Sequence, residues 1–134
     1  MTYRTIVFVL AAAGALSCAA ASVVAAVGED VVLTPGKSVR IGTSGARLSF
    51  DTVTADSRCA TDVQCVWAGN AAVRVRVWGD TGAPRTVELN STVAPKEALI
   101  DGYVLRFVAL APAPVSTASI KPADYRLTVR LERP

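Results

Sequence analysis

The sequence predicts an all-β protein, an antiparallel β-sandwich or small barrel of seven to eight short strands that follows an N-terminal signal segment. Three observations lead to this prediction. Short apolar runs recur after residue 27, and turn residues separate them. Two of these runs, residues 71–78 and 125–132, alternate apolar and polar side chains with a period of two. No segment after residue 27 keeps a helical period over eight or more residues.

Residues 1–26 have the pattern of a secretory signal. Arg4 supplies a positive charge near the start, and an almost uninterrupted apolar run follows as far as Ala26. A retained membrane anchor is the alternative, because the run is long enough to span a bilayer. Its many alanines make it only weakly hydrophobic, which favours export with cleavage. We therefore expect an exported protein of the periplasm or outer cell envelope, with one all-β domain at residues 27–134.

Two cleavage sites fit this leader. Ala15-Leu16-Ser17-Cys18 resembles a bacterial lipobox, in which the cut falls before a lipidated cysteine, although leucine is usual where Ala15 stands. An ordinary cut after Ala26 would instead make Cys18 a residue of the discarded leader. The apolar stretch after Cys18 favours the ordinary cut, whereas the odd count of three cysteines favours lipidation.

Cys59 and Cys65 are predicted to form a disulfide. They are the only cysteines left if Cys18 is lipidated or removed, and an exported domain meets an oxidising compartment. The ring is short, so the loop-length model gives it about 2 kcal/mol of stabilisation. Two free buried thiols are the alternative. The spacing differs from the C-x-x-C redox motif, and two cysteines without histidine cannot complete a zinc site.

Apolar runs and turn signals divide the rest of the chain into short strands. Asp101-Gly102 is typical of a two-residue hairpin turn, because both positions accept positive φ angles. The run that follows it is apolar on both faces apart from one arginine, so we place it centrally in a sheet. Strands are expected at residues 30–34, 37–42, 47–53, 71–78, 85–89, 98–100, 103–110 and 125–132.

The composition argues against several classes of function. The chain has no histidine, which removes Ser-His-Asp and Cys-His pairs, the commonest general base and the commonest zinc ligand. It also has no calcium-loop motif and no glycine-rich phosphate loop, so we predict neither an enzyme nor a metal or cofactor site. The net charge is only +3, and the arginines are spread among acids, so nucleic-acid binding is not expected.

Residues 56–71 are the most distinctive segment. They read DSRCATDVQCVWAGNA. The segment resembles a signature close to D-S-R-C-P-x-x-V-x-C-x-W-A-G-x-A, found in a family of small, uncharacterised bacterial exported proteins and lipoproteins; Ala60 stands where proline is usual. Residues 105–114 and 124–126 resemble a later strand, a P-x-P stretch and the closing strand of that family, so the resemblance covers most of residues 46–132. The resemblance implies export and an all-β domain, but it does not indicate what the activity is.

This segment has two open interpretations. In the first, the disulfide holds a compact turn, Val63 and Trp67 pack beneath it, and Arg58 pairs with Asp56 or Asp62. In the second, a rigid loop presents Arg58, Asp62 and Trp67 to a partner, because loops on β-scaffolds often carry recognition and Trp and Arg dominate many binding surfaces.

Arginines also gather on two strand faces. Arg74, Arg76 and Trp78 share one face, and Arg126 and Arg130 share another. If these strands are neighbours, the faces would form one surface for phosphate or carboxylate polymers. The alternative is an ordinary solvated face whose charges resist edge pairing.

The function predicted from these features is that of a non-catalytic binding or interaction domain of the cell envelope. Its expected partner is an envelope protein or an anionic envelope polymer, and contact with the membrane is expected only through a lipid anchor at Cys18. A secreted inhibitor of a hydrolase, of the protease or lysozyme type, and a structural stabiliser without a discrete ligand are the alternatives.

Overall fold

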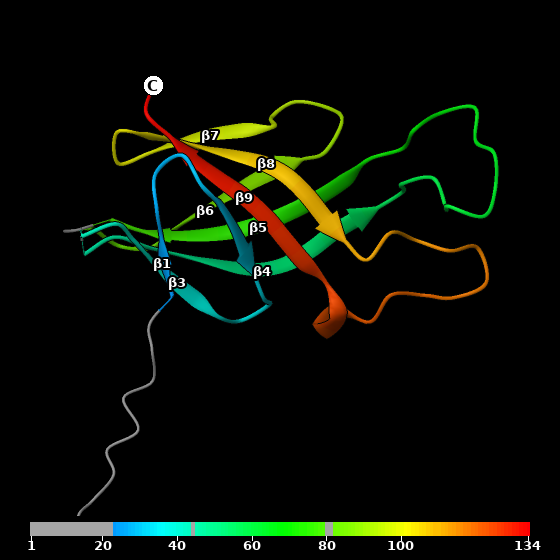
Figure 1. Ribbon diagram of the computed structural model, residues 1–134, viewed down its shortest axis with the longest axis horizontal. Helices are drawn as coiled ribbons and strands as arrows, with labels where there is room; N and C mark the ends of the chain where they lie inside the picture. The colour runs from blue at the N-terminus through cyan, green and yellow to red at the C-terminus, as the bar shows by residue number, and fades with distance from the viewer. Residues whose placement is uncertain (1–22, 44, 80–81) are drawn as a thin grey trace, which may run out of the picture.

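The computed structural model describes residues 23–43, 45–79 and 82–134, so the predicted signal run and Cys18 lie outside the described residues. The described chain is all-β, with nine strands in two sheets and one 3-10 helix, η1 (Figure 1). The predicted fold class is therefore confirmed. The strands are β1 Val24–Ala25, β2 Asp30–Leu33, β3 Ser38–Ile41, β4 Arg47–Asp56, β5 Ala71–Trp78, β6 Arg85–Asn90, β7 Glu97–Ile100, β8 Tyr103–Ala111 and β9 Arg126–Glu132, and η1 is Pro122–Asp124.

The strands form a five-stranded sheet in the order β1-β3-β4-β5-β6 and a four-stranded sheet in the order β2-β9-β8-β7. The pairings are antiparallel except that β1 runs parallel to β3. The two arginine-bearing strands, β5 and β9, belong to different sheets. The predicted joint surface therefore does not form. That surface was predicted to combine Arg74 and Arg76 of β5 with Arg126 and Arg130 of β9.

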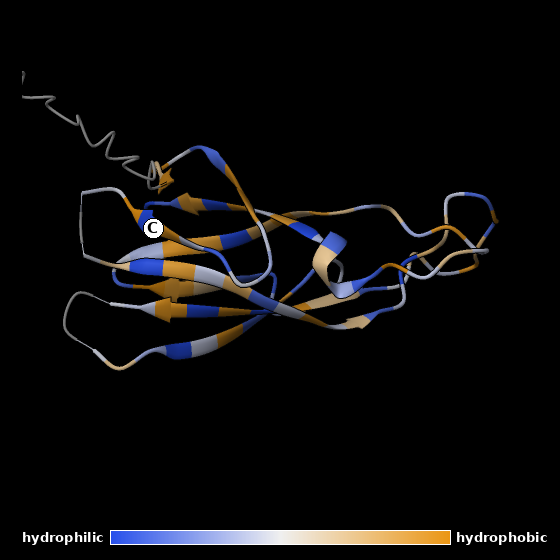
Figure 2. Ribbon diagram, turned by 90° about the horizontal axis from the view of Figure 1, so that it is seen from below, coloured by the Kyte–Doolittle hydropathy of each residue, from blue (hydrophilic) through white to orange (hydrophobic). Residues whose placement is uncertain are grey.

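The core lies between the sheets and is built from alternate residues of each strand. Val73, Val75 and Val77 of β5 are at most 1% exposed, and Phe50 of β4 is fully buried. Figure 2 shows the resulting alternation of apolar and polar residues along the strands. In the last strand segment the inward residues are the predicted ones, which are Tyr125, Leu127, Val129 and Leu131.

The sheet begins upstream of the predicted domain start at residue 27. Ala25 is fully buried, its carbonyl accepts a hydrogen bond from the Gly42 amide, and the Val23 carbonyl accepts one from the Arg40 amide. Residues before 27 thus contribute both backbone pairing and core contact. Within the described part of the chain, no helix has the length and apolar character needed to cross a membrane.

The predicted hairpin is present between β7 and β8. Asp101 has a φ of 46° and Gly102 a φ of 80°, the combination that this turn requires. Strand β8 pairs with β7 on one side and β9 on the other, so its predicted central position is confirmed. Beyond the opposite end of the sandwich, the connections β4–β5 and β8–β9 extend together away from the sheets (Figure 1).

Candidate functional site

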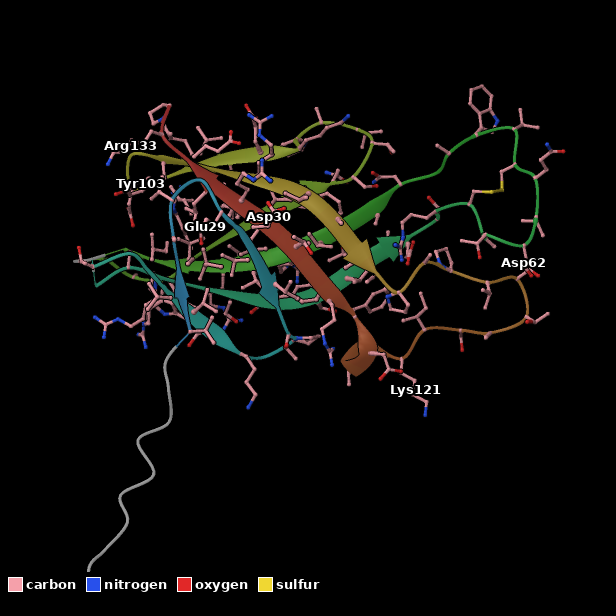
Figure 3. The ribbon with its side chains drawn as sticks, viewed as in Figure 1. Glu29, Asp30, Asp62, Tyr103, Lys121 and Arg133 are labelled. Atoms are coloured by element: carbon pink, nitrogen blue, oxygen red, sulfur yellow. A yellow bond between two sulfur atoms is a disulfide. The ribbon has the colours of Figure 1, made fainter. Side chains whose placement is uncertain are left out.

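These two connections form a projection that we name the two-loop tip, residues 57–70 and 112–121. Its loops are joined to each other by hydrogen bonds. The Thr61 amide donates to the Pro114 carbonyl at 2.9 Å, and the Ser116 amide donates to Asp62 Oδ1 at 2.8 Å. The Ser116 hydroxyl also donates to Asp62 Oδ2. Asp62 lies at the far end of the tip, away from the sheets (Figure 3).

Arg58 holds the base of the tip together. Its Nε and Nη2 donate to the two carboxylate oxygens of Asp56 at 2.8 and 2.7 Å. Its remaining donors reach the carbonyls of Leu110 and Pro112, at the start of the second loop. The Arg58 side chain is 16% exposed, so little of it is accessible to a partner. Of the two predicted pairings the structure contains the one with Asp56, and this arginine positions the tip.

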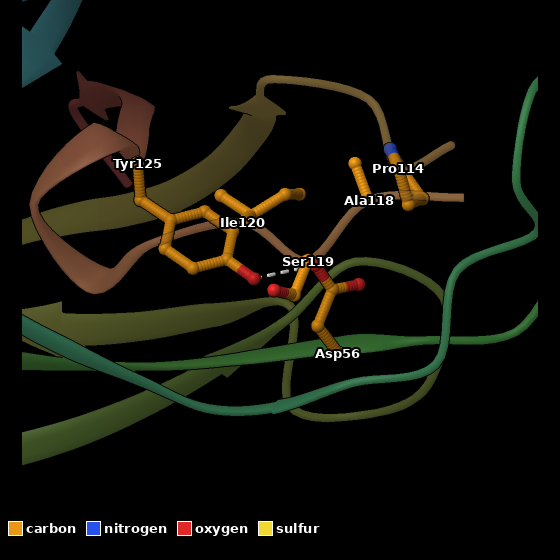
Figure 4. Close-up of a pocket in the computed structure, with 6 residues that line it drawn as sticks. All are labelled: Asp56, Pro114, Ala118, Ser119, Ile120 and Tyr125. Atoms are coloured by element: carbon orange, nitrogen blue, oxygen red, sulfur yellow. Dashed lines mark hydrogen bonds between the residues drawn. The ribbon is translucent and has the colours of Figure 1, made fainter. Parts of the chain in front are cut away.

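Asp56 also accepts a hydrogen bond from the Tyr125 hydroxyl at 3.0 Å. The hydrogen bond from Arg58 is the main cause that lowers the pKa of Asp56, whereas burial, followed by the bond to Asp56, raises the pKa of Tyr125. Both side chains line a cavity of about 280 Å³ beside the second loop (Figure 4). The Asp56 carboxylate and the Tyr125 hydroxyl that line this cavity already bond to each other.

The predicted disulfide between Cys59 and Cys65 is present, with a Cα–Cα distance of 5.9 Å. It closes the outer part of the first loop, and the Cys59 amide donates to the Ala68 carbonyl across the same loop. The bridge and the contacts between loops together restrict the tip, which carries no sheet of its own.

Asn70 joins the first loop to the sandwich. Its Oδ1 accepts hydrogen bonds from the Thr92 amide and hydroxyl at 3.0 and 3.1 Å, and its Nδ2 donates to Asn90 Oδ1 at 2.8 Å. The Ser57 amide donates to the Asn70 carbonyl at 2.8 Å. The sequence reasoning did not identify this network, or the role of Ser116, because the partners are distant in sequence and are common polar residues.

Besides Asp62, the tip exposes several apolar side chains. Trp67 is 82% exposed, Val66 91%, Val63 48% and Val115 41%. The predicted packing of Val63 and Trp67 beneath the disulfide is therefore wrong. Hydrogen bonds and the disulfide hold the loop instead, so no apolar core is needed under it.

The three predicted partner-binding residues thus occupy different environments. Trp67 is free to contact a partner. Asp62 is exposed, and its hydrogen bonds from Ser116 lower its pKa, so it carries a negative charge at neutral pH. Arg58 lies at the base, engaged with Asp56 and two carbonyls.

No family model, curated protein or solved structure matches this chain. Across the described ranges, no group of three or more Cys, Asp or Glu side chains is placed to hold a metal ion.

Acidification is expected to weaken the domain through Asp56. Arg58 holds the pKa of this carboxyl below its ordinary value of 3.8, so the unfolded chain binds the proton first. The stabilisation is present above pH 4 and is lost as the pH falls through the folded-state pKa. Urea unfolding at pH 7, 4, 3 and 2 measures the free energy of unfolding. As the pH falls, this free energy should decline less steeply for Asp56→Asn than for the unchanged protein. Protonation of Asp62 removes the same amount of stability from both proteins. Equal slopes of the free energy of unfolding against pH would therefore contradict the prediction.

Proposed function

We propose that this protein is an exported, non-catalytic domain of the cell envelope that binds a partner protein through the two-loop tip. The observation that carries the proposal is the exposure of Trp67 and Val66 at the end of a constrained projection. Large apolar groups in such positions lose solvent contact on binding, and a restricted loop loses little conformational entropy in the process.

The charge of the tip supports a protein partner over an anionic polymer. In the described tip residues the cations are Arg58, which is bonded to Asp56, and Lys121, at the end next to η1. The far end carries the ionised Asp62 instead. A phosphate or carboxylate polymer would meet a negative charge there, whereas an apolar pocket on a protein fits Trp67 and Val66.

Export rests on the leader, and the strand β1 supports a cut before Cys18 over a cut after Ala26. The later cut would remove β1 and with it the buried Ala25. The earlier cut leaves a short tether between the lipidated cysteine and the first strand. Mass spectrometry of the mature N-terminus in a lipoprotein-processing bacterial host checks this point, and an N-terminus at Val27 would contradict it.

Site-specific photocrosslinking in living cells tests the partner proposal. A photoreactive phenylalanine analogue replaces Val66 in one variant and Val32, which is 57% exposed on β2, in the control variant. We expect one discrete protein adduct from position 66 and none from position 32. The adduct at position 66 should disappear when Trp67→Ser is added. Adducts of equal yield from both positions, or none from position 66, would refute the proposal.

A second function, inhibition of a hydrolase, is favoured by the narrow shape of the projection. A loop restrained by the Cys59–Cys65 bridge and by hydrogen bonds to a second loop can enter an active-site cleft without unfolding. Inhibition assays against purified lysozymes and serine proteases distinguish this function. Inhibition that Trp67→Ser removes would make the partner an enzyme, and no inhibition across both classes would leave the envelope-protein proposal.

A further inference from the structure

A second surface lies on the outer face of the five-stranded sheet, where β3, β4 and β5 run side by side (Figure 1). The register aligns Arg40 with Arg47 and Arg47 with Trp78 in one row across the three strands. Arg76 lies two residues before Trp78 on the same face, because side chains alternate along a strand. We name these four residues the arginine row.

The indole of Trp78 organises two of these cations. The guanidinium carbon of Arg47 lies 5.5 Å from the ring centroid and that of Arg76 lies 5.8 Å from it, both within cation–π range. Such contacts orient the guanidinium groups while their N–H donors stay available. The row is therefore partly preorganised.

At one end of the row, the positive charge has no carboxylate partner among the described residues. Arg76 pairs with Asp51 at 2.7 Å. Arg40 and Arg47 make no ion pair with any carboxylate of the described residues, and both are exposed. They lie directly opposite each other, and like charges in that position destabilise a sheet. An anion between them would relieve this repulsion.

We propose that the arginine row binds a phosphate-linked polyol polymer of the cell envelope. A phosphate offers several oxygens to neighbouring guanidinium groups, which engage it in two-point contacts. Charge complementarity identifies the ligand chemistry, and the exported location in the proposed function identifies a polymer of the cell envelope as its source. This surface is separate from the two-loop tip, so the protein has one site for a protein partner and another for the polymer.

Poly(glycerol phosphate) of defined length is the probe for this site, measured by isothermal titration calorimetry at 50 mM salt. We expect saturable binding that weakens at least about 10-fold in Arg40→Ser/Arg47→Ser. The charge-matched control is Lys121→Ser/Arg133→Ser, two exposed cations without a hydrogen bond or ion pair from their side chains among the described residues. We expect the control to change the affinity less than about 2-fold.

Titrations with other polymers distinguish a phosphate-polymer ligand from other polymers. Uncharged dextran should not bind, and polygalacturonate and a 20-base-pair DNA duplex should bind more weakly than poly(glycerol phosphate). A preference for either of these, equal losses in the two double variants, or no saturable binding would overturn the proposal. The Val66→Ser/Trp67→Ser variant should bind the polymer normally, so failure of this site and failure of the tip are distinguishable. Thermal unfolding of each variant verifies that it is folded.

Discussion

Replacing Gly69 with alanine is expected to destabilise the domain by about 2–5 kcal/mol, through left-handed backbone strain and a steric clash. Gly69 has a φ of +70°, and a Cβ built there would lie 1.7 Å from the carbonyl oxygen of Ser57. Relief requires the backbone on both sides of the first loop to separate. That movement would break the hydrogen bond from the Ser57 amide to the Asn70 carbonyl. Urea unfolding measures the loss.

Substitutions at two other glycines distinguish the effect of the backbone strain from the effect of the steric clash. Gly36 has a φ of +74° and open space around its Cβ position, so Gly36→Ala carries only the backbone strain. Gly82 also has open space and no positive φ, so Gly82→Ala should be close to neutral. The expected order of destabilisation is Gly69, then Gly36, then Gly82. A Gly69→Ala variant no less stable than Gly36→Ala would show that the close approach to Ser57 is absent.

Replacing Arg58 with alanine is expected to cost about 2–4 kcal/mol of stability and to release the two-loop tip. The substitution leaves the Asp56 carboxylate, whose side chain is 12% exposed, with the Tyr125 hydroxyl as its remaining side-chain donor. It also removes the donors to the carbonyls of Leu110 and Pro112. Hydrogen exchange should accelerate in both loops, while amides in β5 and β9 stay protected as long as the domain is folded.

Arg106 provides the matched control. It makes ion pairs with Glu97 and Glu132, but it is 48% exposed and the two partner side chains are 52% and 34% exposed, so Arg106→Ala should cost less than about 1 kcal/mol. Arg58→Lys should recover only part of the loss, because one ammonium group cannot reach the carboxylate and two carbonyls in the same geometry. Similar values for Arg58→Ala and Arg106→Ala would show that Arg58 is an ordinary surface cation.

The strands were predictable because their signals are local. The alternation in residues 71–78 and 125–132 and the turn residues Asp101-Gly102 each depend on the nearby backbone alone. The disulfide was predictable from the cysteine count. Strand order depends on distant pairings, so the separation of β5 from β9 into two sheets was not accessible from the pattern. Strand β1 was missed because its two residues fall within the predicted signal segment.

The site was predicted less completely than the fold. Residue type favoured burial of Val63 and Trp67, but polar contacts and the disulfide hold their loop, so both side chains remain exposed. The hydrogen bond from the Ser116 amide to Asp62 joins residues that are 54 positions apart in the sequence, so no local pattern indicates it. The arginine row depends on the register of β3 against β4, which places Arg40 opposite Arg47, and no local pattern fixes that alignment.

The separation between the residues that hold the tip and those that it exposes has a consequence for how this protein diverges. Its conformation depends on Arg58, Gly69, Asn70 and the disulfide, whereas the outermost side chains, Val66 and Trp67, contribute almost no buried contact. Mutations at the outermost positions should therefore have little effect on folding, and under the proposed function they should alter partner preference. Under that proposal, natural variants change specificity there one residue at a time, and an engineer can randomise the same positions as a display library on an unaltered scaffold.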